Sequence, residues 1–211
     1  MNLANKLTIF RIILVPIMVI IPFLGIQGEI LGIPLTLLIV DLIFIIASLT
    51  DKLDGYIARS KNQVTTFGKF LDPLADKILV LSAMIMLVEM GKIPGWIPII
   101  VLAREFIVSG YRLVAVEKGG KVVAASKWGK LKTVTQMLAI ILAFIDKFNF
   151  FDFVRATTDT TTAMQSSFMI QMSQGEIILN SVTSILLVIS VIATIFSGYE
   201  YLKEGKELLK D

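Results

Sequence analysis

The chain contains neither cysteine nor histidine, and each absence excludes a class of chemistry. Without cysteine there is no disulfide scaffold, no thiolate metal site and no cysteine nucleophile. Without histidine there is no Ser–His catalysis, no His-ligated zinc and no His general base. Any chemistry therefore depends on Asp, Glu, Lys, Arg, Ser, Thr or Tyr.

Charged residues are also scarce, at 18% of the 211 residues, where ordinary globular chains carry roughly 25%. Hydrophobic residues make up 55% of the chain, and its mean hydropathy is +0.81. This apolar content exceeds what a single soluble core of this size can bury. The composition therefore predicts a membrane protein.

Six apolar stretches approach the length of about 20 residues that crosses a bilayer. They are residues 8–26, 33–50, 71–90, 94–116, 134–148 (with a polar helical lead-in) and 177–196. We therefore predict an all-α, polytopic fold over residues 1–211, a single domain with six transmembrane helices and a cytoplasm-facing polar cavity. We expect residues 156–175 to be a polar extramembrane connection and the charged tail 199–211 to form a helix on the membrane surface.

Basic residues predict the orientation of these spans. With six spans, the two termini and the second and fourth loops share one side, and the opposite side carries only Lys92, Lys147 and Arg155. The positive-inside rule then places both termini in the cytoplasm of a multi-pass cell-membrane protein. Arg104 and Arg112 fall within a span, where a charge is costly unless it lines a cavity or meets a partner.

Four aspartates form two pairs at the predicted cytoplasmic ends of the second and third spans. Asp51 and Asp54 are three residues apart and Asp72 and Asp76 are four apart, so each pair lies on one helix face. Only a short polar loop, residues 60–67, separates the two helices, which makes them antiparallel neighbours. The spacing therefore predicts that the four carboxylates converge at one membrane face.

Carboxylates gathered near a low-dielectric region need cations to offset their repulsion. Oxygen ligands favour magnesium, manganese or calcium, and two such ions can hold the oxygens of a phosphate group. Gly55, Ala58 and Gly68 leave room for a ligand against the helix backbones, and Arg59 can bind phosphate bidentately. The pattern favours a diphosphate site. The alternative is that these aspartates are simply solvated residues at helix ends. That would account equally well for one pair, but not for two pairs at the same membrane face.

The segment from Asp51 to Asp76 reads D-x2-D-G-x2-A-R-x8-G-x3-D-x3-D and resembles the signature of the CDP-alcohol phosphatidyltransferases at all eight fixed positions. This resemblance implies transfer of a phosphatidyl group from a CDP-lipid to an alcohol, with release of CMP. It implies that Asp51, Asp54, Asp72 and Asp76 bind two divalent cations, Mg²⁺ or Mn²⁺, and that Asp76 is also the catalytic base. It further implies a homodimer.

The same resemblance assigns a set of residues to the CDP-lipid, CDP-diacylglycerol. They are Asn5, Thr8, Asp54, Gly55, Ala58, Arg59 and Gly68.

Basic residues around the fourth and fifth spans point to an anionic acceptor. Arg104 and Arg112 lie on an otherwise apolar helix, and Lys130 and Lys132 begin the next, so these side chains could gather around a phosphate. Together with Arg11, these residues resemble the branch of the family whose acceptor is sn-glycerol 3-phosphate. The resemblance implies phosphatidylglycerophosphate as the product and membrane lipid as a partner, with the active site in the cytoplasm and no nucleic-acid partner.

Two alternatives stay open at this point. The chain could belong to the same family but use another acceptor, in phosphatidylinositol phosphate, cardiolipin or phosphatidylserine synthesis. It could also be a divalent-cation transporter. The position of all four aspartates near one membrane face argues against transport, because a conduction path needs sites through the bilayer.

Overall fold

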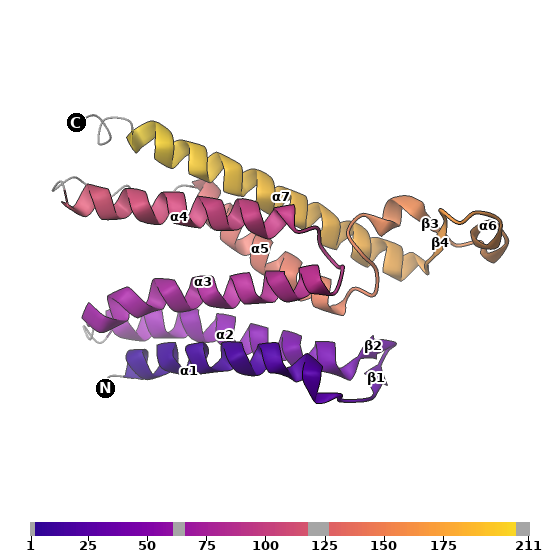
Figure 1. Cartoon of the computed structure of the whole chain (residues 1–211), viewed down its shortest axis with the longest axis horizontal. Coiled ribbons are helices and arrows are strands. Elements are labelled where there is room, and N and C mark those ends of the chain that lie inside the picture. Colours follow the sequence, from indigo (N-terminus) through magenta and orange to yellow (C-terminus); the bar gives the residue numbers. More distant parts are fainter. Residues whose placement is uncertain (1–2, 61–65, 118–126, 206–211) are drawn as a thin grey trace. The chain divides into compact units, whose positions relative to one another are not determined.

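The computed structural model describes residues 3–60, 66–117 and 127–205, and most of them lie in helices (Figure 1). The chain divides into two compact units. The first comprises Met1–Gly91 with Ile141–Lys147, and the second comprises Lys92–Ile140 with Phe148–Asp211.

Three long helices make up most of the first unit. They are α1 (Leu3–Ile20), α2 (Leu35–Ser60) and α3 (Thr66–Glu89), and a short 3-10 helix, η1 (Ile21–Leu24), follows α1. Helix α1 packs against both α2 and α3 (Figure 1). The N-terminal helix therefore makes the most extensive helix–helix packing in this unit.

The packed face of α1 is polar over its first half. Asn5, Thr8 and Arg11 are buried at helical spacing. The Thr8 hydroxyl donates a hydrogen bond of 2.6 Å to Oδ1 of Asp72 in α3. The Arg11 Nε donates one of 3.3 Å to the Ala47 carbonyl of α2. Polar contacts therefore tie the start of α1 to both neighbouring helices.

A tight hairpin joins η1 to α2. Strands β1 (Glu29–Ile30) and β2 (Ile33–Pro34) pair antiparallel, with Leu31 and Gly32 between them at φ values of 56° and 73°. Positive φ at both central residues is the conformation of a two-residue hairpin turn that follows the strand twist. A Cβ at Gly32 would lie 2.7 Å from the Lys147 Nζ, but this flexible end of the lysine can move, so the positive φ is the main reason for glycine here.

The second unit contains the long helices α4 (Trp96–Glu117) and α7 (Gln174–Gly205), which pack together, and α5 (Lys127–Ile145) up to residue 140. Four short elements lie between α5 and α7. They are η2 (Asp152–Arg155), β3 (Ala156–Thr157), α6 (Thr160–Gln165) and β4 (Ile170–Gln171), with β3 and β4 paired in parallel. The polar segment expected as a plain connection is therefore a small folded substructure.

Helix α7 carries a buried stripe of small polar residues. Thr183, Ser190, Thr194 and Ser197 are all at least nine-tenths buried. The Ser190 hydroxyl donates to the Leu187 carbonyl over 2.8 Å, and the Thr194 hydroxyl donates to the Ser190 carbonyl over 2.6 Å. Small residues whose hydroxyls bond their own helix allow close helix packing without an unsatisfied polar group.

Polarity in the long helices is inverted relative to a water-soluble protein. On α1, Phe10, Ile13 and Ile17 are exposed while Thr8 and Arg11 are buried. Apolar side chains outside and hydrogen-bonded polar side chains inside suit a hydrocarbon environment. The surface of this helix is therefore typical of one that faces lipid.

Three helices in the described part of the chain are long and apolar enough to cross a membrane. They span Asn5–Leu24, Lys127–Ile145 and Gln174–Lys203, and Leu35–Thr50 of α2 forms a shorter apolar helix. The expected all-α fold is confirmed apart from the two short strand pairs, and the apolar helices indicate a membrane protein. Six spans and a polar cavity stay predictions.

Two helices continue well past the C-terminal ends of the apolar stretches expected from the sequence. Helix α2 continues from residue 50 to Ser60, and α7 continues from residue 196 to Gly205. Residues 199–205 thus prolong the last long helix, and residues 206–211 lie outside the described part of the chain. The membrane-surface position of this tail stays a prediction.

Candidate functional site

The first aspartate pair lies on the last three turns of α2. The α2 backbone is helical through Asp51, Asp54, Gly55, Ala58 and Arg59, as the spacing of these residues predicts. Their side chains lie outside the described part of the structure. What is established here is that one continuous helix leads from an apolar segment into the signature residues.

The second pair lies on the second and third turns of α3. Asp72 and Asp76 are both half-buried, and Gly68 is buried one turn before Asp72. Asp72 accepts the hydrogen bond from Thr8, so two predicted site residues, 64 positions apart in the chain, are in direct contact. Asn5, a third predicted residue, is buried one turn before Thr8 on α1.

Among the described side chains, no group of three or more acidic residues is placed to hold a metal ion. Asp51 and Asp54 lie outside that set, so the four-carboxylate cluster stays a prediction. The donor chemistry on α3 nevertheless suits a hard cation, since Asp72 and Asp76 supply carboxylate oxygens. Thr8 holds one of these carboxylates in place, as second-layer hydrogen bonds do around metal ligands.

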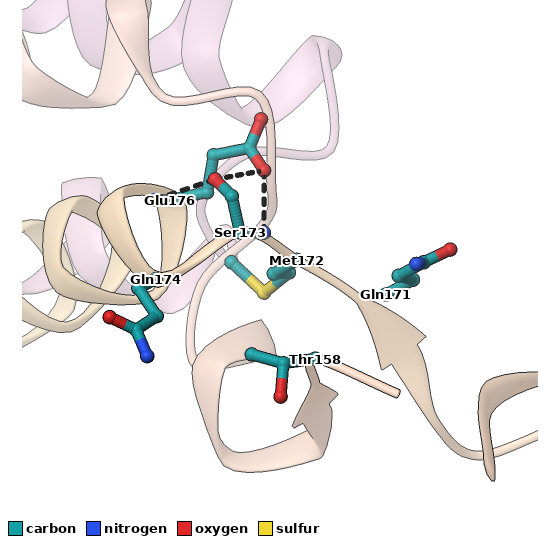
Figure 2. Close-up of a pocket in the computed structure, with 6 residues that line it drawn as sticks. All are labelled: Thr158, Gln171, Met172, Ser173, Gln174 and Glu176. Atoms are coloured by element: carbon teal, nitrogen blue, oxygen red, sulfur yellow. Dashed lines mark hydrogen bonds between the residues drawn. The ribbon is translucent and has the colours of Figure 1, made fainter. Parts of the chain in front are cut away.

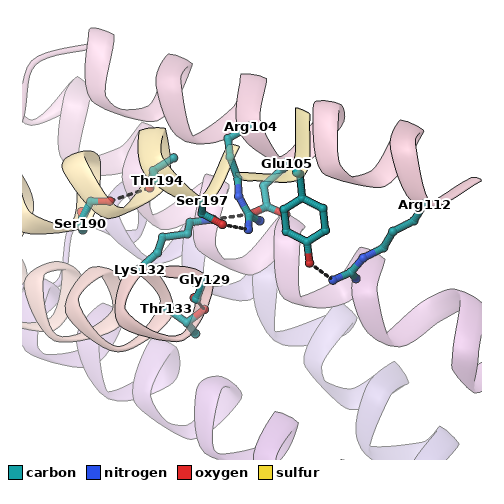
Figure 3. Close-up of polar contacts among 10 residues, drawn as sticks. Arg104, Glu105, Arg112, Gly129, Lys132, Thr133, Ser190, Thr194 and Ser197 are labelled. Atoms are coloured by element: carbon teal, nitrogen blue, oxygen red, sulfur yellow. Dashed lines mark hydrogen bonds and ion pairs between the residues drawn. The ribbon is translucent and has the colours of Figure 1, made fainter. Parts of the chain in front are cut away.

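In the second unit, three of the predicted acceptor residues, Arg104, Arg112 and Lys132, make polar contacts between helices (Figure 3). Glu105 of α4 forms ion pairs with Arg104, over 3.1 Å, and with Lys132 of α5. Arg104 Nη2 also donates to the Ser197 hydroxyl of α7 over 2.5 Å. One carboxylate thus orders two cations on different helices.

Tyr201 of α7 contacts both arginines of α4. Its hydroxyl accepts a hydrogen bond of 2.9 Å from Arg112 Nη2. The Cζ atoms of Arg104 and Arg112 each lie 5.6 Å from the centre of its ring, within the range of cation–π attraction. Tyr111 packs edge-on against the same ring, at 6.3 Å between centroids.

The remaining two predicted acceptor residues differ in exposure. Lys130 is exposed on the first turn of α5. Arg11 is 0% exposed in the first unit, where its Nε bonds the Ala47 carbonyl. The contact of Arg11 favours a role in joining α1 to α2, and its part in binding the acceptor stays a prediction.

Sequence reasoning missed Ser197 and Tyr201. The expected last span ended at residue 196 and the expected surface tail was 199–211, whereas α7 continues through both residues. The available signal was the spacing of Thr194, Ser197 and Tyr201, three and four residues apart, which puts polar side chains on one face of an apolar helix.

A pocket of about 490 Å³ lies at the start of α7 (Figure 2). It is lined by Thr158, Gln171, Met172, Ser173, Gln174 and Glu176. Ser173 and Glu176 form a capping box, in which the Ser173 N–H and hydroxyl donate to Glu176 Oε2 over 2.9 and 2.8 Å. These polar groups stabilise the helix start, and the lining contains none of the predicted site residues.

Nearby, Asp159 caps α6. Its side chain accepts a hydrogen bond of 2.8 Å from the Thr161 N–H. This bond to the backbone, together with one from the Thr162 side chain, lowers the pKa of the Asp159 carboxyl. These hydrogen bonds stabilise the start of α6, and they give no reason to assign Asp159 a binding role.

Comparison with known sequences gives a consistent result. The model of the family described as CDP-alcohol phosphatidyltransferase matches residues 1–196. The chain is 39% identical over 216 residues to the CDP-diacylglycerol–glycerol-3-phosphate 3-phosphatidyltransferase of Bacillus subtilis, covering 99% of this chain and 97% of the relative.

Two other relatives carry the same name. The protein of Haemophilus influenzae is 46% identical over 143 residues, covering 66% of this chain and 73% of the relative. That of Rickettsia typhi is 35% identical over 207 residues, covering 97% of each. With its aspartate signature on α2 and α3 and a match that covers nearly all of its length, this chain belongs to the CDP-alcohol phosphatidyltransferase family.

Proposed function

We propose that this chain transfers a phosphatidyl group from CDP-diacylglycerol to sn-glycerol 3-phosphate, yielding phosphatidylglycerophosphate and CMP. One observation carries the proposal: the complete aspartate signature occurs in a chain similar over 99% of its length to a transferase named for that donor and that acceptor. The structure supports it through the placement of the signature residues.

The geometry of α2 supports a shared carboxylate site. Val40, Phe44 and Ala47 are fully buried and mark the packed face of this helix. At 100° per residue, positions 51 and 54 fall within about 40° of Val40 around the helix axis. On this spacing, the first aspartate pair would continue the packed face of α2.

The second pair occupies the corresponding face of α3. Gly68, Ala75 and Leu79 are buried, and Asp72 falls among them at helical spacing. Asp54 lies six residues before the end of α2, and Asp72 lies six residues after the start of α3. At 1.5 Å per residue, both are about 9 Å from the ends that residues 61–65 connect. These equal distances support our proposal that the two pairs converge.

This donor set would hold two divalent cations, Mg²⁺ or Mn²⁺, which fits a family that uses divalent cations. The ligands would be Asp51, Asp54, Asp72 and Asp76, all hard oxygen donors. When bound, the ions would offset the repulsion among the carboxylates and the negative charge of the diphosphate. Thr8 keeps the Asp72 carboxylate oriented through its hydrogen bond.

In the reaction, Asp76 accepts the proton of the acceptor hydroxyl. The hydroxyl oxygen forms a bond to the β-phosphorus of CDP-diacylglycerol as the bond between that phosphorus and the bridging oxygen breaks. The electron pair of the broken bond leaves with CMP. A carboxylate fills the role of base because the chain has no histidine.

The CDP-lipid would be bound by residues of α1, α2 and the start of α3. They are Asn5, Thr8, Asp54, Gly55, Ala58, Arg59 and Gly68. Small residues allow the nucleotide close to the helix backbones, and a guanidinium can bind phosphate oxygens bidentately.

The residues proposed to bind the acceptor phosphate are the cations Arg11, Arg104, Arg112, Lys130 and Lys132. Glu105 and the α7 contacts hold Arg104 and Lys132 in fixed geometry. Fixed guanidinium groups are suited to a dianionic phosphate because they bind it with two parallel hydrogen bonds.

For the whole chain we propose six membrane spans in the cell membrane and a polar cavity that opens to the cytoplasm. Both termini and the active site would lie on the cytoplasmic side, where loop lysines and arginines are concentrated. A homodimer is the proposed assembly.

A panel of acceptors tests this function. Purified protein is incubated with CDP-diacylglycerol, Mg²⁺ or Mn²⁺, and one acceptor at a time: sn-glycerol 3-phosphate, myo-inositol phosphate, phosphatidylglycerol or serine. We expect the highest kcat/KM for CMP release with glycerol 3-phosphate. A higher value with another acceptor would assign a different branch, and metal flux into vesicles without any CDP-lipid would favour transport.

A further inference from the structure

The last turns of α7 contact the cations expected to bind the acceptor. The family match ends at residue 196, whereas Ser197 and Tyr201 lie just beyond it on the same helix. Ser197 accepts a hydrogen bond from Arg104, and Tyr201 accepts one from Arg112. The chain after the family match therefore reaches two predicted acceptor residues.

The Tyr201 side chain is buried, whereas its hydrogen-bond partner Arg112 is exposed. The Tyr201 side chain is 2% exposed, yet its hydroxyl meets the exposed Arg112 over 2.9 Å. Among the described residues, Tyr201 is the one hydrogen-bond partner of Arg112. A fixed phenol thus holds one N–H of a guanidinium that has further donors for a ligand.

The Tyr201 ring also lies within reach of both arginine side chains. Arg104 and Arg112 are eight residues apart on α4, about 12 Å along the helix axis. Both Cζ atoms nevertheless lie 5.6 Å from the ring centre, so the two side chains lean toward it. One aromatic ring therefore fixes the directions of two cations.

We propose that Tyr201 is a positioning residue for the acceptor phosphate and that Ser197 assists it, by orienting Arg112 and Arg104. The inference rests on the proposed function, in which these arginines bind glycerol 3-phosphate. A cation already held in its binding geometry loses less rotamer freedom when the ligand arrives. Because the signature aspartates perform the transfer itself, this α7 segment would tune selection of a phosphate-bearing acceptor.

Substitution Tyr201→Phe keeps the ring and removes only the hydroxyl. We expect KM for glycerol 3-phosphate to rise by about 3- to 10-fold, the cost of one hydrogen bond. We expect kcat and KM for CDP-diacylglycerol to stay within about twofold. The matched control is Tyr199→Phe on the same helix, where the side chain is 62% exposed, and its kinetics should equal those of the wild type.

A double variant separates positioning from simple packing. In an Arg112→Gln background, Tyr201→Phe should raise the acceptor KM no further, because the two changes remove the same interaction. An additional rise in that background, or a matching rise in KM for CDP-diacylglycerol, would show a structural role and overturn the inference. Should Tyr201→Phe not fold, Ser197→Ala must show the same acceptor-specific rise in KM, and a wild-type KM there overturns it.

The failure of this inference is distinct from that of the proposed function. If the wild-type protein releases no CMP with glycerol 3-phosphate, both the proposed function and this inference are wrong. An active wild-type enzyme whose Tyr201→Phe variant keeps the wild-type acceptor KM removes this inference alone.

Discussion

At the scale of single residues, Thr8 shows how a small side chain can serve a site indirectly. Resemblance assigned it to the CDP-lipid, and the structure places its hydroxyl 2.6 Å from the Asp72 carboxylate. In the proposed function Asp72 is a metal ligand, and a hydrogen bond to a ligand carboxylate fixes its rotamer and so affects cation affinity. Thr8 can therefore matter to the reaction without touching the reacting atoms.

Replacing Thr8 by Val removes the hydroxyl with little change in side-chain volume. We expect the Mg²⁺ or Mn²⁺ concentration for half-maximal CMP release to rise by about 10-fold or more, because Asp72 loses its orienting bond. Thr8→Ser retains the hydroxyl and is the matched control, with near wild-type metal dependence expected. A Thr8→Val variant with unchanged metal dependence would remove the link between Thr8 and cation binding.

The residues recognised from sequence are those whose chemistry has a fixed local spacing. Asp51 to Asp76 form one short motif, and the helices predicted for it are present. The pairing of Glu105 with Lys132, and of Arg112 with Tyr201, joins residues 27 and 89 positions apart. Helical periodicity identifies which face a residue occupies, but not which distant helix that face meets.

At the scale of helices, hydropathy located each long helix but placed the C-terminal ends of two of them about ten residues too early. The apolar part of α2 ends at Thr50, and the helix continues to Ser60. Backbone hydrogen bonds maintain a helix whether or not its residues are apolar, so hydropathy marks only the segment suited to lipid. The same reason explains why the tail after residue 199 was expected to be a separate helix.

Close packing between α4 and α7 gives a prediction at this scale. A Cβ at Gly198 would lie 3.4 Å from Arg104 Cγ, while a Cβ at Gly110 would meet nothing within 4 Å. The Cβ alone makes an ordinary contact, so it is the two γ-methyl groups of Gly198→Val that should displace Arg104, lowering the unfolding free energy by about 1–3 kcal/mol and raising KM for glycerol 3-phosphate.

Gly110→Val is the control, since it makes the same change in an open position of α4. Thermal unfolding in detergent and steady-state kinetics would compare the two variants. Equal melting temperatures and equal acceptor KM values for both would contradict the packing argument.

At the scale of the whole molecule, composition predicted the environment well. Apolar residues face outward on α1 while polar ones are buried, which is the arrangement that an apolar solvent favours. The sequence also supplied the family, because its signature is complete. Neither composition nor spacing predicted the small substructure between η2 and β4, since its short elements lack a long periodic pattern.

The absence of cysteine makes the membrane topology directly testable. Single cysteines can be placed at Thr161, on the proposed outer side, and at Lys127, on the proposed cytoplasmic side; both positions are exposed. A membrane-impermeant maleimide should label Thr161→Cys in intact cells and Lys127→Cys only after permeabilisation. The reverse pattern, or labelling of both in intact cells, would contradict the proposed orientation.

The most direct test of the proposed chemistry is CMP release by an Asp76→Asn variant. The substitution preserves the size of the side chain and removes the proton acceptor. With saturating CDP-diacylglycerol, glycerol 3-phosphate and Mg²⁺ or Mn²⁺, we predict a fall in rate of about 10²- to 10⁴-fold, with a melting temperature close to that of the wild type. A folded variant that releases CMP at nearly the wild-type rate would contradict the assignment of Asp76 and, with it, the carboxylate-centred mechanism.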